Sequence, residues 1–285
     1  EICQELGITL VATFHTAFDQ KRRNFSSSTQ HLAYQVYAPR LANYDKVIVF
    51  SQIQRNLLVK LGVPLERVAV IPNGVDISRY SPGPSSIKQD LNARQLYVYQ
   101  GRLSPEKNVE SMLKGWRAAN MHPKDKLVIV GSGPIEASLK AFYADRSIVW
   151  LGFVADEERR IEILRGADAF ILPSLVEGLS LSLLEAMACG TACVATDAGA
   201  DGEVLDKGAG VILNTQKVSS QLQTLFPLFR EHAEITQMLG KKARSRVLER
   251  YTLTQNITQL EQLYSVTTPL SHHQFSLQST KLPQT

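Results

Sequence analysis

The stretch "ADAFILPSLVEGLSLSLLEAMACGTACVAT", residues 167–196, indicates the fold class of the chain. The runs at 167–174 and 191–196 are apolar without polar alternation, which is typical of strands covered on both faces. The apolar segment between them, 180–190, has the length of a helix. A strand, a helix and a second strand in this order predict a parallel β-α-β unit.

The same alternation runs along most of the chain and predicts an α/β fold. Further strands are expected at 8–15, 45–51, 67–73, 95–101, 126–131, 147–153 and 209–213. Further helices are expected at 27–42, 52–61, 108–120, 134–143, 156–166, 217–231 and 234–250. Repeated β-α-β units build an open, doubly wound parallel sheet, which binds its ligands at the carboxyl ends of the strands.

The segment "NGVDISRYSPGPSS" (73–86) is rich in Gly, Pro and Ser and predicts a domain boundary. Residues 1–78 then form a partial N-terminal Rossmann-like domain, and residues 79–250 form a complete one. The polar, aperiodic end of the chain, 266–285, is expected to be disordered.

Composition sets outer limits on function. The formal net charge of +4 is too weak and dispersed to indicate nucleic acid as a partner. Cys3, Cys189 and Cys193 lack the spacing of a zinc site or a disulfide framework, so a reducing cytoplasm is expected. No run approaches the ~18 to 20 apolar residues of a membrane span.

Four loops at the ends of predicted strands carry candidate binding groups. They are "GRLSPEKN" (101–108), "GSGP" (131–134), "GFV" (152–154) and "EGLSLSLLEAM" (177–187). Because the carboxyl ends of parallel strands meet at one edge of a sheet, we expect these loops to converge on one crevice.

The groups in these loops suit a diphosphate. Arg102 and Lys107 supply cations, and an arginine can chelate phosphate oxygens. Gly131 and Gly133 allow a ligand to approach the backbone closely. A helix beginning near Leu179 would add the backbone N–H groups of Gly178 and Leu179 at the positive end of its dipole.

Two carboxylates flank this diphosphate site. Glu177 lies at the mouth of the predicted helix, and a rise of ~1.5 Å per residue puts Glu185 about 8 to 10 Å deeper. A nucleoside diphosphate sugar places a diphosphate between two polyols, and a carboxylate can accept hydrogen bonds from two neighbouring hydroxyls. We therefore expect Glu185 to hold the ribose and Glu177 to hold the transferred sugar.

Taken together, the E-x7-E pair, "GRLSPEKN" and "VIVGSGP" resemble the retaining GT-B glycosyltransferases of family 4. The resemblance runs from about "VIPNGVD" (70–76) to "RYTLTQNITQLEQLYSV" (250–266), and more loosely back to "ATFHTAFD" (12–19). It implies two Rossmann-like domains and a helix at 251–265 that crosses back to the N-terminal domain. It also implies sugar transfer from a nucleotide-sugar donor, linked to UDP, GDP or ADP, with neither a metal nor a cofactor.

The resemblance assigns roles to individual residues. Arg102 and Lys107 would bind the diphosphate, Glu177 the donor sugar and Glu185 the ribose. Backbone at Phe153 and Val154 would hold the base. His15 matches the family's histidine that faces the donor sugar from the end of an N-terminal strand, and is expected to be catalytic with Glu177.

Two departures from the family pattern accompany this match. Nothing before "EICQELGITLVATFH" (1–15) supplies the strands and Gly-rich loop that normally begin the N-terminal domain, so a shortened acceptor side is expected. The Gly-Gly pair that follows the next strand is Gly199-Ala200 here.

The same residues bear on three alternatives to a glycosyltransferase. "GSGP" lacks the third glycine of a dinucleotide fingerprint, because Glu136 stands in its place. A nucleotide-sugar epimerase would need a different acid–base set. A non-catalytic module that binds a nucleotide sugar stays open.

The acceptor is expected to be a lipid or a saccharide. "FHTAF" (14–18), followed by Lys21, Arg22 and Arg23, is similar to enzymes that glycosylate lipids at a membrane surface. Clustered cations attract anionic headgroups, although a short run of charge is usually only a solvated loop. The expected location is the cytoplasm, with weak attachment to the inner face of a membrane.

Overall fold

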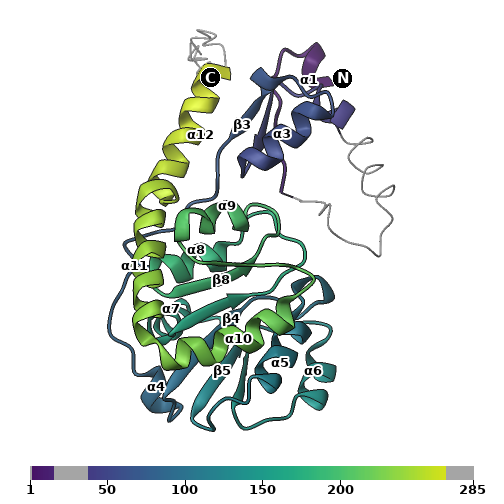
Figure 1. Cartoon of the computed structure of the whole chain (residues 1–285). Coiled ribbons are helices and arrows are strands. Elements are labelled where there is room, and N and C mark those ends of the chain that lie inside the picture. Colours follow the sequence, from purple (N-terminus) through teal and green to yellow (C-terminus); the bar gives the residue numbers. More distant parts are fainter. Residues whose placement is uncertain (1, 16–37, 268–285) are drawn as a thin grey trace, which may run out of the picture.

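The computed structural model describes residues 2–15 and 38–267, which contain two parallel sheets (Figure 1). The smaller sheet has the strand order β1-β2-β3. Its strands are β1 (Val11–Thr13), β2 (Lys46–Val49) and β3 (Val68–Val70). The described helices of this part include α1 (Ile2–Glu5) and α3 (Gln52–Lys60), with a 3₁₀ turn at Leu65–Arg67.

The larger sheet has the strand order β6-β5-β4-β7-β8-β9, which is that of a doubly wound dinucleotide-type fold. Its strands are β4 (Gln95–Gln100), β5 (Asp125–Val130), β6 (Ile148–Gly152), β7 (Ala169–Leu172), β8 (Ala192–Thr196) and β9 (Val211–Leu213). The chain order reverses between β4 and β7. In such sheets the ligand crevice lies at this reversal, outside the carboxyl ends of the strands.

Helices connect these strands and follow the last one. They are α4 (Ile87–Asp90), α5 (Val109–Ala118), α6 (Glu136–Phe142), α7 (Glu157–Gly166), α8 (Leu181–Ala188), α9 (Asp201–Leu205), α10 (Val218–Glu231), α11 (Ala233–Arg250) and α12 (Leu253–Thr267). Two further 3₁₀ turns lie at Pro105–Lys107 and Asp206–Gly208.

All nine strands expected from the sequence are present in the described residues. The helices expected between 52 and 265 are present too, with ends that differ by a few residues. Three helices were not expected, namely α1, α4 and α9, because each has only four or five residues and shows no full helical period. Most of the predicted helix 27–42, the basic run 21–23 and most of the tail 266–285 lie outside the described residues.

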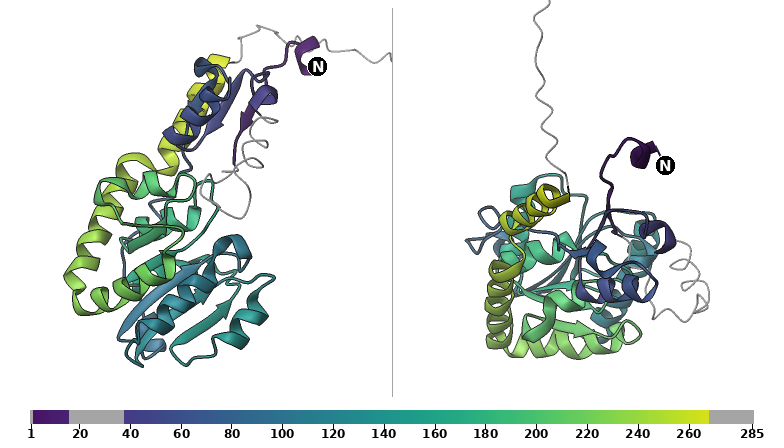
Figure 2. Two further views of the ribbon diagram at one scale, coloured as in Figure 1. Left: turned by 45° about the vertical axis from the view of Figure 1, so that its right-hand side comes forward. Right: turned by 90° about the horizontal axis from the view of Figure 1, so that it is seen from above.

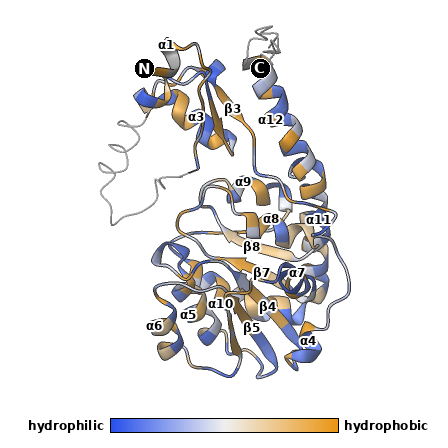
Figure 3. Cartoon of the chain, turned by 180° about the vertical axis from the view of Figure 1, so that it is seen from behind, coloured by the Kyte–Doolittle hydropathy of each residue, from blue (hydrophilic) through white to orange (hydrophobic). Residues whose placement is uncertain are grey.

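Helices cover both faces of the larger sheet. Figure 1 shows α5 and α10 on its near face, and Figure 3, seen from behind, shows α7 and α8 on the other. On the α5–α10 side, the rings of Tyr97, Trp116 and Phe226 meet edge to face, with centroids 5.1 to 5.3 Å apart. The strands between these helices are apolar on both faces, as Figure 3 shows in orange, because both faces are buried.

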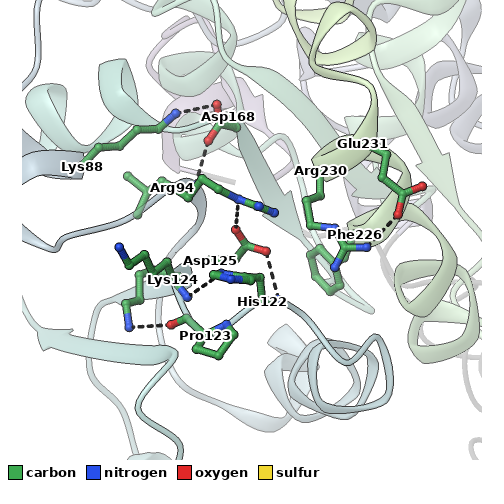
Figure 4. Close-up of polar contacts among 12 residues, drawn as sticks. Lys88, Arg94, His122, Pro123, Lys124, Asp125, Asp168, Phe226, Arg230 and Glu231 are labelled. Atoms are coloured by element: carbon green, nitrogen blue, oxygen red, sulfur yellow. Dashed lines mark hydrogen bonds and ion pairs between the residues drawn. The ribbon is translucent and has the colours of Figure 1, made fainter.

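The amino ends of the central strands are held by ion pairs, far from the expected ligand edge (Figure 4). Asp168 accepts hydrogen bonds from Lys88 Nζ (2.6 Å) and from the backbone N–H of Leu96 (2.7 Å). Asp125 is fully buried and accepts from Arg94 Nε (3.3 Å). These contacts align β4, β5 and β7 at their starts and leave the opposite edge for function.

Two chain segments run side by side between the two sheets. Val75 and Thr252 form a parallel β-bridge, and the Val75 N–H donates to Tyr251 O (2.9 Å). Just beyond, Asn256 Nδ2 of α12 donates to Pro72 O (2.7 Å). Figures 1 and 2 show α12 extending from the larger sheet toward the smaller one. Among the described residues, no helix is long and apolar enough to cross a membrane.

Candidate functional site

Three loops after neighbouring strands are joined by backbone hydrogen bonds at the carboxyl edge of the larger sheet. The Gly101 N–H donates to Val130 O (2.9 Å), and the Gly131 N–H donates to Gly152 O (2.7 Å). Leu103 N–H donates to Ser132 O (2.9 Å). The loops after β4, β5 and β6 therefore form one continuous backbone surface, in agreement with the expected convergence.

Two glycines make this close packing possible. A Cβ on Gly131 would lie 1.9 Å from Gly101 O, and Gly131 also has a φ of +130°, which other residues rarely adopt. A Cβ on Gly133 would lie 2.2 Å from Leu103 O. Neither position can carry a side chain without separating the loops.

A cavity of about 700 Å³ opens over these loops. It is lined by Gln100, Gly101, Arg102, Val130, Gly131, Ser132, Gly133, Phe153, Val154 and Arg160. Five of the eleven residues predicted for the site therefore line it: Arg102, Gly131 and Gly133, expected at the diphosphate, and Phe153 and Val154, expected at the base. Its volume is in the range of pockets that hold ligands of nucleotide size.

Phe153 and Val154 lie at one end of the cavity, directly after β6. Phe153 is 76% exposed, whereas the partly buried Val154 packs against the core. Arg160 Nη1, from α7, donates to the carbonyl oxygens of both Val154 and Ala155 at 2.9 Å. An arginine was not expected here, because its place on α7 cannot be related to the 152–154 loop from sequence spacing.

Glu185 lies beside the cavity on α8 and is held by Gln100, the last residue of β4. Gln100 Nε2 donates to Glu185 Oε2 at 2.8 Å. Burial raises the pKa of Glu185, while Arg160 and hydrogen bonds from Gln100 and Tyr80 oppose the shift. A partly desolvated carboxylate of this kind favours a ligand that brings hydroxyl donors to it.

Glu177 lies in a second polar group, between β7 and α8. Lys107 Nζ contacts Glu177 Oε1 at 2.7 Å, and Ser174 Oγ donates to the same oxygen at 2.7 Å. The side chains of Lys107 and Glu177 are only 22% and 10% exposed. The structure thus joins the predicted diphosphate cation directly to the predicted sugar carboxylate.

The mouth of α8 lies next to this pair. The helix begins at Leu181 and not at Leu179, because Ser180 is its N-cap and its Oγ accepts from Leu183 N–H. The buried Asp201 accepts from the Ser180 N–H (2.9 Å), and burial raises the pKa of Asp201 well above its usual range. Asn73 Nδ2 donates to Leu179 O at 3.3 Å.

His15 follows β1 of the smaller sheet and meets the same place from the other side. A Cβ on Gly178 would lie 2.3 Å from His15 O, so the two backbones touch. The His15 ring packs edge to face on Phe50 with centroids 5.1 Å apart. His15 and Gly178, 163 positions apart in sequence, are therefore neighbours in space.

Several polar residues of the site were not identified from the sequence. They are Gln100, Arg160, Ser174 and Asp201. Gln100 carried a signal, since it is a polar residue at the end of an otherwise apolar strand, "QLYVYQG" (95–101). The others carry none, because their partners come from other elements.

The sequence predicts no metal site, and the described residues are 2–15 and 38–267. In that part of the chain, no group of three or more His, Cys, Asp and Glu side chains is arranged to hold a metal ion.

The strand order and the glycine-floored cavity define a nucleotide-binding α/β protein of the GT-B type. Sequence comparison agrees with this class. Residues 94–226 match the family "Glycosyl transferases group 1", and residues 2–79 match "Glycosyltransferase Family 4". The chain belongs to this glycosyltransferase family.

Curated relatives share about a quarter of their residues with the chain. The Escherichia coli UDP-Gal:alpha-D-GlcNAc-diphosphoundecaprenol alpha-1,3-galactosyltransferase is 26% identical over 241 residues, which are 79% of this chain and 58% of the relative. A Mycobacterium tuberculosis GDP-mannose-dependent alpha-(1-6)-phosphatidylinositol dimannoside mannosyltransferase is 27% identical over 231 residues, which are 78% of this chain and 60% of the relative. The chain spans less than two thirds of their length.

Solved structures with the same fold include complexes with nucleotides. Anabaena HepE in complex with UDP-glucose has a TM-score of 0.76 and 23% identity, over 92% of this chain and 74% of that chain. Sucrose-phosphate synthase from Thermosynechococcus elongatus has a TM-score of 0.75 and 24% identity, over 93% and 69% of the two chains. At these identities the likeness establishes the GT-B fold alone.

Proposed function

We propose that the chain is the donor-binding part, with some of the acceptor side, of a retaining glycosyltransferase. It transfers a sugar from a nucleotide diphosphate sugar to a lipid or saccharide acceptor, without a metal. One observation carries the proposal: a cavity floored by glycine backbone, flanked by a half-buried carboxylate on one side and by a cation–carboxylate pair at the mouth of α8.

Each part of that site matches one part of the donor. The base lies by Phe153 and Val154, and Glu185, oriented by Gln100, accepts from the ribose hydroxyls. Gly131, Gly133 and Arg102 hold the diphosphate together with Lys107 and the N–H groups of Gly178 and Leu179. These roles are proposals that rest on the lining of the cavity and on the family resemblance.

The reacting end of the donor lies between Glu177 and His15 in this proposal. As the glycosidic bond breaks, negative charge develops on the diphosphate and positive charge on the sugar ring. Lys107 stabilises the first and Glu177 the second, and preorganised charges of this kind act most strongly in the transition state. Contact between the His15 and Gly178 backbones supports a donor site completed by both sheets.

The relatives support the proposed partners. The Escherichia coli relative is named for an acceptor on diphosphoundecaprenol, and the Mycobacterium tuberculosis relative for a phosphatidylinositol dimannoside. We extend a lipid or saccharide acceptor to this chain, with a cytoplasmic location at a membrane surface. The division of the chain near residue 78 belongs to the same proposal.

Calorimetric titration of the chain with UDP, GDP and ADP tests the donor site. At least one nucleotide should bind, and no binding of any at millimolar concentration would contradict a nucleotide-sugar site. Incubation with the matching sugar donor and an acceptor then tests the chemistry. An α-linked donor should give an α-linked product in early proton NMR spectra; an inverted product contradicts retention, and binding without transfer favours the non-catalytic module.

A further inference from the structure

The Arg160 side chain lies at the end of the cavity where the donor base is proposed to bind. It projects from the first turn of α7, and both N–H groups of Nη1 are used, one for Val154 O and one for Ala155 O, each at 2.9 Å. The guanidinium therefore holds the backbone of the loop that follows β6.

This arrangement changes what the loop offers to a ligand. Backbone carbonyls at a base-binding edge are acceptors that favour the amino or imino groups of a base. Here the Val154 and Ala155 carbonyls already accept from a cation, whose positive charge repels a second donor. Arginine has five N–H donors and no acceptor, so any ligand atom that the guanidinium itself binds must be an acceptor.

The surroundings keep this cation in place. Arg160 is partly buried and lines the cavity. Its charge lowers the pKa of Glu185, whose net shift is upward because of burial. It also hydrogen-bonds toward Tyr80, which is buried and donates to Glu157 Oε1 at 3.0 Å. Arg160 thus lies between the proposed base and ribose ends of the site.

We infer that Arg160 selects a donor base with a carbonyl at C4 of a pyrimidine or C6 of a purine, as in uracil or guanine, over one with an amino group at that position, as in cytosine or adenine. The inference rests on the proposed function, since it assigns the base within that nucleotide site. A carbonyl oxygen accepts from the guanidinium edge, whereas an amino group would place a donor against a cation and against carbonyls already in use.

UDP and CDP give the sharpest comparison, because their rings differ only at C4 and N3. Uracil has a carbonyl at C4 and a proton on N3, whereas cytosine has an amino group at C4 and no proton on N3. A hydrogen bond to a charged group discriminates by about tenfold or more, so calorimetry on the whole chain should find UDP at least about tenfold tighter than CDP. GDP should likewise bind more tightly than ADP. The outcome that overturns the inference is CDP binding as tightly as UDP, or ADP as tightly as GDP.

A neighbouring arginine provides a matched control. Arg159 is one position earlier on the same helix, but it faces Asp90 and Glu162 and does not line the cavity. Arg160→Gln should bring the UDP-to-CDP ratio to within about threefold of one, whereas Arg159→Gln should keep the parent ratio. Equal ratios in the two variants would contradict a role for Arg160.

A stability measurement and a third variant distinguish loss of the fold from loss of base selectivity. Thermal unfolding of both variants checks that Arg160→Gln keeps the fold, and Arg160→Lys retains the charge without the planar fork. Lysine should preserve part of the preference if charge contributes to it. Binding of all four nucleotides with equal affinity overturns only this inference, whereas binding of none contradicts the proposed function itself.

Discussion

Glu185 shows at the residue scale how binding and stability oppose each other in this site. The carboxylate is half-buried beside the cavity, where it interacts with Gln100, Tyr80 and the charge of Arg160. Burial disfavours the ionised form, so its pKa is raised. Gln100 is a second feature that lowers stability, because its Oε1 is buried with no hydrogen-bond partner in the structure. Both features are typical of sites arranged for a ligand.

Glu185→Gln should make the chain more stable at neutral pH. Below its unfolded pKa, Glu185 is protonated in both states, so burial of its charge costs nothing. As the pH rises through the raised folded pKa, the folded state must hold an ion that burial disfavours, so the parent loses stability that the neutral glutamine keeps. Urea denaturation should find the stability difference between variant and parent growing from about pH 4 to pH 7.

The matched control is Glu110→Gln, which alters an exposed pair with Lys114 on α5. Exposed ion pairs contribute about 0 to 1 kcal/mol to the free energy of unfolding, so the denaturation midpoint of Glu110→Gln should stay near that of the parent. A Glu185→Gln variant that is less stable than the parent at pH 7 would show that the ionised carboxylate stabilises the folded chain, contrary to this account.

At the scale of elements, the site depends on how closely the loops after β4, β5 and β6 approach one another. The backbone hydrogen bonds that join them leave no space for a side chain at Gly131. Gly152, in the next loop, provides a contrast. It has a φ of +67°, but an added Cβ would meet nothing within 4 Å.

Gly131→Ala should therefore lower the free energy of unfolding more than Gly152→Ala does. An alanine in left-handed backbone costs about 1 kcal/mol, which is the whole effect expected at Gly152. At Gly131 the methyl group also forces Gly101 away, so we expect a loss of about 2 to 4 kcal/mol and weaker nucleotide binding. Urea denaturation of the two variants checks the order, and equal losses would mean that the loops separate easily.

Much of this element-scale organisation is predictable from the sequence. The apolar runs of the strands and the glycines at their ends are local signals, so all nine strands and the convergence of four loops could be expected. The start of α8 lies two residues after the predicted Leu179, because Ser180 caps the helix and Asp201, from another element, accepts from the Ser180 N–H. The contacts of Gln100 and Arg160 depend on packing between elements, which spacing along one element does not encode.

At the scale of the whole molecule, two parallel sheets meet at the mouth of α8. His15 reaches Gly178 from the end of β1, while Val75 and Thr252 join the two parts on the segments that cross between them. The Gln52 N–H at the start of α3 also donates to Glu203 Oε2 of α9 at 2.9 Å. The transferred sugar is therefore proposed to lie where both parts contribute, whereas the nucleotide lies on the larger sheet alone.

This arrangement gives the two glutamates different tasks, and that difference is the central claim. Glu185 should bind the nucleotide, and Glu177 should bind the sugar and stabilise its developing positive charge. Because Glu177 pairs with Lys107, replacing its charge also frees the lysine for the diphosphate. Glu177→Gln should then keep or tighten the free nucleotide while it lowers turnover by about 10² or more.

The direct measurement is calorimetric titration of the two variants with the free nucleotide that the parent prefers. Glu185→Gln should weaken its binding by about tenfold or more, because a charge-assisted hydrogen bond to the ribose is lost. Glu177→Gln should bind it at least as well as the parent does. Loss of the nucleotide in Glu177→Gln with parent-like binding in Glu185→Gln would contradict the assignment of the two carboxylates.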